Sequence, residues 1–223
     1  MTSAIILAAG KAERMGQGND KAFLSLVNKP VIAWSLLAFE HCREVNSIVL
    51  VVRKDQQLAA KAVASMFGIS KLSKIVTGGA RRQDSVLAGL AACDVDTRYV
   101  VIHDGARPCI QPDVIAETVK LAKHSGAATV GRRLTDTVKR VSKGVTIDAT
   151  EDRSKLWTVQ TPQAFAIRTL RDAYAALGSK TEITDDCQAV EKNGGSVKIY
   201  ESLLPNFKIT TVEDLQLVSA LLK

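Results

Sequence analysis

The sequence predicts an α/β protein in which a mainly parallel β-sheet is sandwiched by helices in a Rossmann-like arrangement. Three observations support this fold class. Short apolar runs rich in β-branched residues recur along the chain, they alternate with patterns of helical length, and most of those patterns start near a proline or a capping residue. Because strand-helix-strand units are right-handed and bring their strands parallel, this alternation predicts helices on both faces of one sheet.

The individual elements follow from these runs. The predicted strands, apolar enough to be buried on both faces, span residues 4–7, 48–52, 74–77, 99–103 and 127–130, with another at 196–200. Helices are expected at residues 30–39, 55–66, 82–92, 112–124, 168–177, 185–192 and 212–222. No repeat, low-complexity segment or flexible linker divides the chain, so we expect a single domain over residues 1–223.

Residues 135–153 interrupt the alternation of strands and helices. The segments 135–141 and 145–148 alternate polar and apolar residues on either side of Lys143-Gly144, which is typical of a β-hairpin about a glycine turn. Both faces of this hairpin are too hydrophilic for the centre of a sheet. We therefore expect a β-hairpin arm that projects from the body of the domain.

Composition limits the class of protein without naming a ligand. The chain is 46% hydrophobic and 24% charged, which is ordinary for a globular protein, and its net charge of +7 favours anionic partners such as phosphates, nucleotides, nucleic acid or an acidic membrane surface. No apolar run approaches the roughly 20 residues of a membrane span, and the amino terminus lacks the basic start of a secretory signal. We therefore expect a cytoplasmic protein with no membrane partner.

The four cysteines predict neither a metal site nor a disulfide framework. They are too far apart in sequence for a Cys-x-x-Cys motif and too few for a disulfide scaffold in a chain of 223 residues. They are Cys42, Cys93, Cys109 and Cys187. We expect reduced thiols, mostly in the core.

Ligands of open α/β sheets bind beyond the carboxyl ends of the strands, so the residues that follow the apolar runs are the candidates for chemistry. The first run leads into Ala8-Ala9-Gly10, small residues whose backbone N–H groups can approach a phosphate chain closely. The loop lacks the Gly-Lys-Ser/Thr of a Walker A motif. Ala12 and Met15 occupy glycine positions of Gly-x-Gly-x-x-Gly, which argues against a dinucleotide site.

Two cations lie in the same loop. Arg14 and Lys21 suit a phosphate chain whose negative charge grows during phosphoryl or nucleotidyl transfer. Two solvated surface charges would produce the same pattern, so this alternative stays open.

Two further loops offer polar groups after predicted strands. Gly78-Gly79 leads into a helix whose first turn presents Ser85, where a base or ribose could bind, although the glycines could also only form the turn. Asp104 follows the run 99–103 and could hold a magnesium nucleotide or a ribose hydroxyl, since Mg²⁺ favours one or two carboxylates with phosphate oxygens. A structural capping role is the alternative for Asp104, and we expect His103 to be structural.

The last third of the chain places polar groups beside short apolar runs, but none of them is specific alone. These groups are Arg153, Thr161-Pro162-Gln163, Thr184-Asp185-Asp186 and the segment 206–210.

In order and spacing, these motifs make the whole chain similar to the 2-C-methyl-D-erythritol 4-phosphate cytidylyltransferases of the non-mevalonate isoprenoid pathway. The matching segments are Leu7-Ala8-Ala9-Gly10, Arg14-Met15, Lys21, Asp84-Ser85-Val86, His103-Asp104-Gly105-Ala106-Arg107-Pro108, Asp136-Thr137-Val138-Lys139, Thr161-Pro162-Gln163, Thr184-Asp185 and Lys208-Ile209-Thr210. The resemblance implies a nucleotidyltransferase-type fold and a reaction of CTP with methylerythritol 4-phosphate, dependent on Mg²⁺ or another divalent cation. It also implies a homodimer joined by exchanged arms.

The resemblance also implies a role for each matching residue. Arg14 and Lys21 would hold the triphosphate and stabilise the transition state at the α-phosphorus. The nucleotide contacts would be Ala8, Ala9, Gly10, Gly79, Ser85 and Asp104, with Asp104 also a metal ligand and Arg107 beside it on the substrate side. Arg153 and Thr137 would reach the substrate phosphate of the neighbouring subunit, and Thr161 and Lys208 would complete that pocket. The nucleophile is an ionised phosphate oxygen, so no catalytic base is required.

The sequence departs from the family pattern at several positions of the expected loops. Ala12 stands where glycine is frequent, Asp20 where proline is usual, Ala22 where glutamine is common, Ala80 where a polar residue is frequent and Gly105 where alanine is usual. None of these changes removes a cation that the mechanism needs.

Two other functions stay open. A ribitol-5-phosphate cytidylyltransferase shares the Arg, Lys, Asp and Thr-Pro-Gln pattern, although the segments 84–90 and 106–108 are more similar to the methylerythritol branch. A non-catalytic nucleotide- or RNA-binding protein is the remote alternative that the positive charge suggests. The ten aromatic residues are scattered and predict no base-stacking surface, so we expect no nucleic-acid partner.

Overall fold

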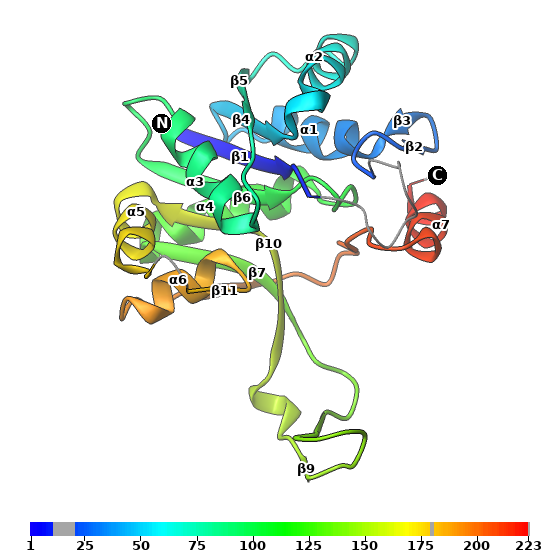
Figure 1. Cartoon of the computed structure of the whole chain (residues 1–223), viewed down its shortest axis with the longest axis vertical. Coiled ribbons are helices and arrows are strands. Elements are labelled where there is room, and N and C mark those ends of the chain that lie inside the picture. The colour runs from blue at the N-terminus through cyan, green and yellow to red at the C-terminus, as the bar shows by residue number, and fades with distance from the viewer. Residues whose placement is uncertain (11–20, 179–180, 223) are drawn as a thin grey trace.

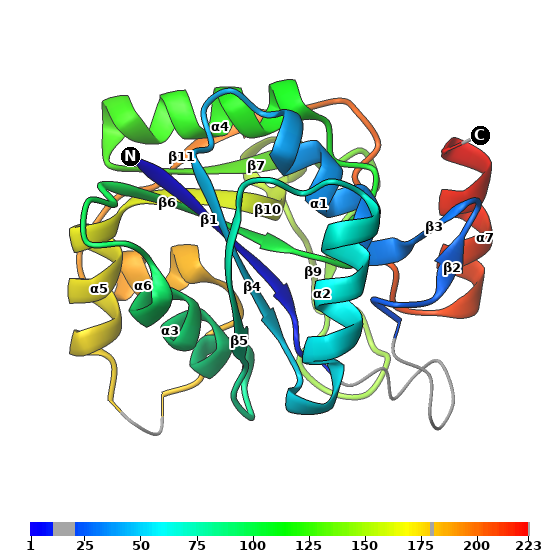
Figure 2. The ribbon, with the colours of Figure 1, turned by 90° about the horizontal axis from the view of Figure 1, so that it is seen from above.

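The structure is a computed structural model, and it describes residues 1–10, 21–178 and 181–222. Its body is built on a seven-stranded sheet of order β11-β7-β10-β6-β1-β4-β5 (Figures 1 and 2). The strands are β1 (Thr2–Ala8), β4 (Ser47–Val52), β5 (Leu72–Thr77), β6 (Tyr99–Asp104), β7 (Ala127–Arg133), β10 (Trp157–Ala166) and β11 (Lys198–Glu201). Neighbouring strands pair in parallel except at β10, which is antiparallel to both β6 and β7. The predicted α/β fold with a mainly parallel sheet is confirmed.

Helices cover both faces of this sheet (Figure 2). One face carries α1 (Val31–His41), α2 (Gln57–Met66) and α4 (Pro112–Ser125), and the other carries α3 (Arg82–Ala92), α5 (Ile167–Ala176) and α6 (Asp186–Lys192). The last helix, α7 (Val212–Leu221), lies beside the sheet rather than on a face of it. Side chains alternate between the faces of a strand, so Ala4 and Ile6 of β1 pack in one core with α1, α2 and α4, while Ile5 packs in the other with α3, α5 and α6. The β1 strand is therefore buried on both sides.

Strand β10 is the strand of the seven-stranded sheet that the sequence analysis missed. Pro162 lies inside it, and proline has no N–H for a central ladder, which argues against a strand from sequence alone. In the structure the pairing of β10 with β7 shifts register between Val159 and Gln163, so the proline falls at the irregularity. Tertiary pairing with β6 and β7 outweighs the local signal here.

The residues of the predicted arm project from the body (Figure 1). Strand β8 (Lys139–Arg140) pairs with β9 (Ala149–Thr150) in an antiparallel hairpin. The second strand predicted at 145–148 is wrong, because the pairing begins only at Asp148, whose backbone N–H donates to the Arg140 carbonyl at 2.9 Å. The Asp148 carboxylate also accepts the Ser142 N–H at 2.5 Å, which closes residues 142–148 into a loop.

A smaller cluster joins α7 to the body. Strands β2 (Ser25–Leu26) and β3 (Lys29–Pro30) form a short hairpin, and Leu26 packs with Val31, Ile209 and Val218. All four cysteines are buried and free, as expected. Among the residues described, no helix is long and apolar enough to cross a membrane.

Candidate active site

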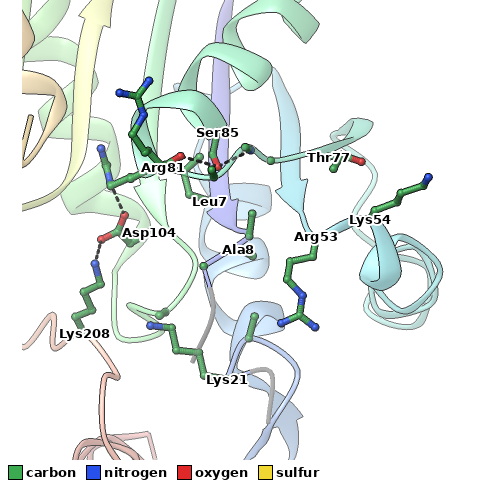
Figure 3. A pocket seen from close by; sticks show the side chains of 18 residues that line it. Leu7, Ala8, Lys21, Arg53, Lys54, Thr77, Arg81, Ser85, Asp104 and Lys208 are labelled. Carbon is green, nitrogen blue, oxygen red and sulfur yellow. Dashed lines mark hydrogen bonds and ion pairs between the residues drawn. The ribbon is translucent and has the colours of Figure 1, made fainter. Parts of the chain in front are cut away.

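A cavity of about 630 Å³ opens at the carboxyl ends of β1, β4, β5 and β6 (Figure 3). This is the edge at which the sequence predicts a ligand. Eight of the predicted site residues line the cavity: Ala8, Ala9, Gly10, Lys21, Gly79, Ser85, Asp104 and Lys208. Segments far apart in sequence therefore meet here, because parallel strands present their carboxyl ends on one side of the sheet.

The loop between β5 and α3 is packed closely against the end of β1. A Cβ on Gly78 would lie 2.4 Å from the Ala9 Cβ and 2.7 Å from the Ser85 Oγ, so a side chain at this position has no space. The Gly79 N–H donates to the Ser85 Oγ at 3.1 Å. At the start of α3, the carboxylate of Asp84, in the first helical turn, reaches back to accept the Arg81 N–H at 3.0 Å, as in a capping box. The glycines thus form the turn and also shape the wall of the cavity.

Asp104 is the centre of a charged cluster. Its Oδ2 accepts from Lys208 Nζ at 2.7 Å, and its Oδ1 accepts from Arg82 Nε at 3.3 Å. Arg107 Nε lies 4.0 Å from Oδ2. Burial by itself would raise the pKa of Asp104, but the charges of Arg82 and Lys208 outweigh it and hold the pKa far below its usual range. Asp104 is therefore an anion at any physiological pH.

The backbone of Asp104 is held from behind by Thr161 and His103. The Asp104 N–H donates to the Thr161 Oγ1 at 3.0 Å, and the same hydroxyl lies 3.2 Å from His103 Nδ1. His103 Nε2 lies 3.2 Å from the Arg107 carbonyl, which can only accept, so we assign the imidazole proton to Nε2 and the Thr161 proton to the bond with Nδ1. Burial lowers the pKa of His103 to about 3, so the ring is neutral.

Several predicted residues lie beside the cavity or away from it. The Thr161 hydroxyl donates to His103, and Arg107 Nη1 donates to the Asn206 carbonyl at 2.8 Å, so both side chains support the wall around Asp104. Thr137 and Arg153 are exposed on the arm, where the Arg153 guanidinium donates to the Thr135 carbonyl. Arg14 lies outside the described residues.

Sequence reasoning missed four charged residues of the cavity, which are Arg53, Lys54, Arg81 and Arg82. Arg53 and Lys54 directly follow β4, so the rule that directs attention to strand ends could have found them. Asp55 holds the Arg53 guanidinium through two contacts of 3.1 and 2.9 Å. Arg82 could not be singled out, because the carboxylates that hold it belong to distant parts of the chain.

The cavity offers little to a metal ion except Asp104. Among the described residues, no three His, Cys, Asp or Glu side chains group closely enough to hold a metal. Asp104 is the one carboxylate among the described lining residues. A single ionised carboxylate in a cavity lined by lysine and arginine side chains nevertheless fits Mg²⁺ that arrives with a phosphate ligand, since Mg²⁺ takes one or two carboxylates and completes its shell with phosphate oxygens and water.

A helix-covered, mainly parallel sheet with a cationic cavity of small residues at its carboxyl edge defines a Rossmann-like α/β protein with a site suited to an anionic ligand. The comparison with known families narrows this class. The model of the 2-C-methyl-D-erythritol 4-phosphate cytidylyltransferase family matches residues 2–223, and the chain belongs to this family.

Curated relatives and solved structures are similar to this protein over nearly the whole chain. Proteins named 2-C-methyl-D-erythritol 4-phosphate cytidylyltransferase are similar to it in Dehalococcoides mccartyi, at 43% identity over 99% of this chain and 95% of the relative, and in Alkaliphilus oremlandii, at 40% over 100% and 95%. The crystal structure of 4-diphosphocytidyl-2C-methyl-D-erythritol synthase from Anaerococcus prevotii superposes with a TM-score of 0.88 at 29% identity, covering 99% of this chain and 95% of that one. The Thermus thermophilus cytidylyltransferase superposes with a TM-score of 0.80 at 30% identity, covering 99% and 98%.

Proposed function

We propose that the protein transfers a cytidylyl group from CTP to 2-C-methyl-D-erythritol 4-phosphate, giving 4-diphosphocytidyl-2-C-methyl-D-erythritol and pyrophosphate, in the synthesis of isoprenoid precursors. The observation that carries this proposal is the convergence of Lys21, Lys208 and the ionised Asp104 in one cavity at the end of β1. Membership of the cytidylyltransferase family supports the choice of substrates.

The chemistry requires charge and position more than proton transfer. A phosphate oxygen of the sugar-alcohol phosphate attacks the α-phosphorus of CTP, and the bond from that phosphorus to the pyrophosphate oxygen breaks. Because the attacking oxygen is already ionised, no base is needed. His103 takes no part in the proposed reaction, since it is fully buried, does not line the cavity and has its Nδ1 atom engaged by the Thr161 hydroxyl. Lys21 and Lys208 stabilise the negative charge that gathers on the reacting phosphates. Arg14, beyond the described residues, belongs to the same proposal.

A divalent cation is part of the proposed reaction. Asp104 would hold Mg²⁺ together with phosphate oxygens, and the ion would neutralise the triphosphate and the leaving pyrophosphate. Lys208 and Arg82 already contact the two oxygens of this carboxylate, so they orient it toward the cavity.

The proposed homodimer would use the arm. Val145 is 95% exposed and Ile147 58% exposed on the loop of the hairpin, which leaves apolar surface that a second subunit could cover. Thr137 and Arg153, on the same arm, would then approach the substrate phosphate in the partner's cavity. The cytoplasmic location stays a prediction from the sequence.

Pyrophosphate release tests the function directly. The protein is incubated with CTP and Mg²⁺ and with either methylerythritol 4-phosphate or ribitol 5-phosphate, with Lys21→Ala as the control. We expect release with methylerythritol 4-phosphate that the Lys21→Ala variant loses. Pyrophosphate release with ribitol 5-phosphate alone would support the same cytidylyl transfer but show that ribitol 5-phosphate is the substrate. Binding of CTP without release from either substrate would instead favour a non-catalytic nucleotide-binding protein.

A further inference from the structure

A chain of buried polar groups runs from the cavity into the layer of α5 and α6. Arg82 contacts Asp104 at 3.3 Å through Nε and Asp186 at 2.8 Å through Nη1. Asp186 is fully buried, and its Oδ1 accepts from the Tyr174 hydroxyl at 2.6 Å. Arg82 lines the cavity, whereas Asp186 and Tyr174 do not. The guanidinium therefore joins a site residue to a carboxylate outside the site.

Gln163 and Asp185, to which the sequence analysis assigned no role, hold Asp186 in place. The Gln163 Oε1 accepts the Asp186 N–H at 3.0 Å, and its Nε2 donates to the Asp185 Oδ2 at 2.8 Å. Asp185 in turn caps α6 by accepting the Gln188 N–H at 2.9 Å. Thr161-Pro162-Gln163 and Thr184-Asp185-Asp186 thus meet and fix the first turn of α6 against β10.

The guanidinium has few other anchors. Its Nη2 atom is buried and has no hydrogen-bond partner among the described residues. Asp104 and Asp186 therefore share the charge of Arg82. Without Asp186, the whole guanidinium charge would act on Asp104, which already carries the contact with Lys208 and lies near Arg107. A carboxylate surrounded by three cations on its own chain is less available to a ligand in the cavity.

We propose that Asp186, with Tyr174 behind it, is a positioning residue for the nucleotide site, and that it acts through Arg82 by setting where Arg82 lies and how strongly it pairs with Asp104. This inference rests on the proposed function and assigns a role to two residues, Asp186 and Tyr174, that do not line the cavity. It predicts that changing Asp186 weakens CTP binding by moving Arg82, separately from any loss in the free energy of unfolding.

The test compares Asp186→Asn and Tyr174→Phe with Gln188→Ala. The first removes the carboxylate charge, the second removes only the hydroxyl that donates to it, and Gln188→Ala loosens the same turn by removing the acceptor of the Thr184 N–H, at 2.9 Å, without touching Arg82. The readouts are kcat and KM for each substrate, the Kd of CTP by calorimetry, and Tm.

We expect Asp186→Asn to weaken CTP binding and kcat/KM for CTP about tenfold or more, with the KM for methylerythritol 4-phosphate within about twofold of the wild type. Tyr174→Phe shifts the CTP values in the same direction by about threefold, and Gln188→Ala leaves them unchanged. If Asp186 acts through Arg82, the effects of Asp186→Asn and Arg82→Lys are not additive in the double variant.

Each contrary result decides between explanations. A lower Tm with unchanged CTP values in Asp186→Asn, or in Tyr174→Phe where the first variant does not fold, would overturn the inference and leave a structural role. Additive effects with Arg82→Lys would do the same. A wild-type protein that binds CTP but releases no pyrophosphate would refute the proposed function, while the Kd values would still test the positioning role.

Discussion

The Nζ atom of Lys208 lies 2.7 Å from the Oδ2 atom of Asp104, across 104 positions of sequence. Asp104 ends β6, whereas Lys208 follows β11, the strand at the far edge of the sheet. The neighbour of Lys208 secures the segment, because the Ile209 N–H donates to the Ala106 carbonyl at 2.8 Å and the Ile209 side chain is fully buried. The ion pair therefore holds the segment after β11 against the edge of the sheet at which the cavity opens.

Replacing Lys208 tests this arrangement. We expect Lys208→Ala to lower kcat/KM about 10²–10³-fold, because it removes a preorganised charge from the reacting phosphates. Pyrophosphate release measures the loss. Lys198→Ala is the matched control, since this exposed lysine on β11 changes the net charge equally and lies outside the cavity. Equal losses in both variants would show that Lys208 acts only through overall charge.

Adding a methyl group at Gly78 tests the close packing of the cavity wall. Gly78→Ala forces the loop away from Ala9 and Ser85, so we expect a loss of about 1–3 kcal/mol in the free energy of unfolding and a higher KM for CTP. Denaturant unfolding and steady-state kinetics measure the two effects. Gly178→Ala is the control, because the added Cβ would lie 3.3 Å from its nearest atom, the Thr181 Oγ1, a far smaller overlap than the 2.4 Å at Gly78. If the free energy of unfolding and the KM for CTP are unchanged in Gly78→Ala, the cavity wall shifts enough to accommodate the methyl group.

The shared hydroxyl of Thr161 predicts a difference between two substitutions. Thr161→Val leaves the Asp104 N–H and His103 Nδ1 without their partner, at a cost of about 1–3 kcal/mol for each buried group. Thr161→Ser keeps the hydroxyl and should retain most of the stability and activity. Urea unfolding and kcat report the outcome. Equal stability and equal kcat in Thr161→Val and Thr161→Ser would show that the hydroxyl contributes to neither.

The buried neutral His103 makes stability depend on pH. Its pKa is about 3 in the folded chain and about 6.5 when unfolded, so between these values the unfolded state binds more protons. The stability that His103 permits is therefore present above pH 6.5 and falls by up to about 1.4 kcal/mol per pH unit as the pH drops toward 3. We expect the free energy of unfolding, measured between pH 6.5 and 4, to fall more steeply with decreasing pH in the wild type than in His103→Gln. Parallel slopes would contradict a buried neutral ring.

Asp104 gives a complementary expectation for ligand binding. Its pKa is held far below the usual range, so the stability from its ion pairs is present above the unfolded pKa of about 3.9 and is lost only in stronger acid. The Kd of CTP between pH 6 and 8 should therefore show no titration from this carboxylate. Asp104→Asn should weaken CTP binding at every pH in that range, as calorimetry would show.

Mixed dimers test whether the arm serves the partner's cavity. Arg153→Ala and Lys208→Ala would each be inactive alone. If Arg153 completes the site of the other subunit, a mixed dimer has one site with both changes and one intact site. Random exchange of equal amounts of the two variants makes about half of the dimers mixed. With one intact site of two in each mixed dimer, about a quarter of the wild-type activity is restored. No recovery would mean that the arm acts on its own chain or that no dimer forms.

Much of the site could be predicted because it lies where strands end. Apolar runs identified β1 and β6, and the rule for parallel sheets directed attention to Ala8, Ala9, Gly10 and Asp104, all of which line the cavity. The charged pair of Asp104 with Arg82 could not be predicted, since it depends on how the start of α3 packs beside the end of β6. The hydroxyl of Thr161 shows the same limit, because its partners are set by β10, which Pro162 hid from sequence reasoning.

The sequence by itself determined most of the strands and helices in their order, the edge of the sheet at which the cavity opens, and two of the cations that line it, Lys21 and Lys208. These follow from local patterns of apolar and polar residues, which act over a few turns or one strand. Only the tertiary structure decided that β10 enters the sheet antiparallel between β6 and β7, and that Tyr174, Asp186 and Arg82 line up behind Asp104. Contacts between segments a hundred residues apart depend on packing of the whole chain, and no local pattern encodes them.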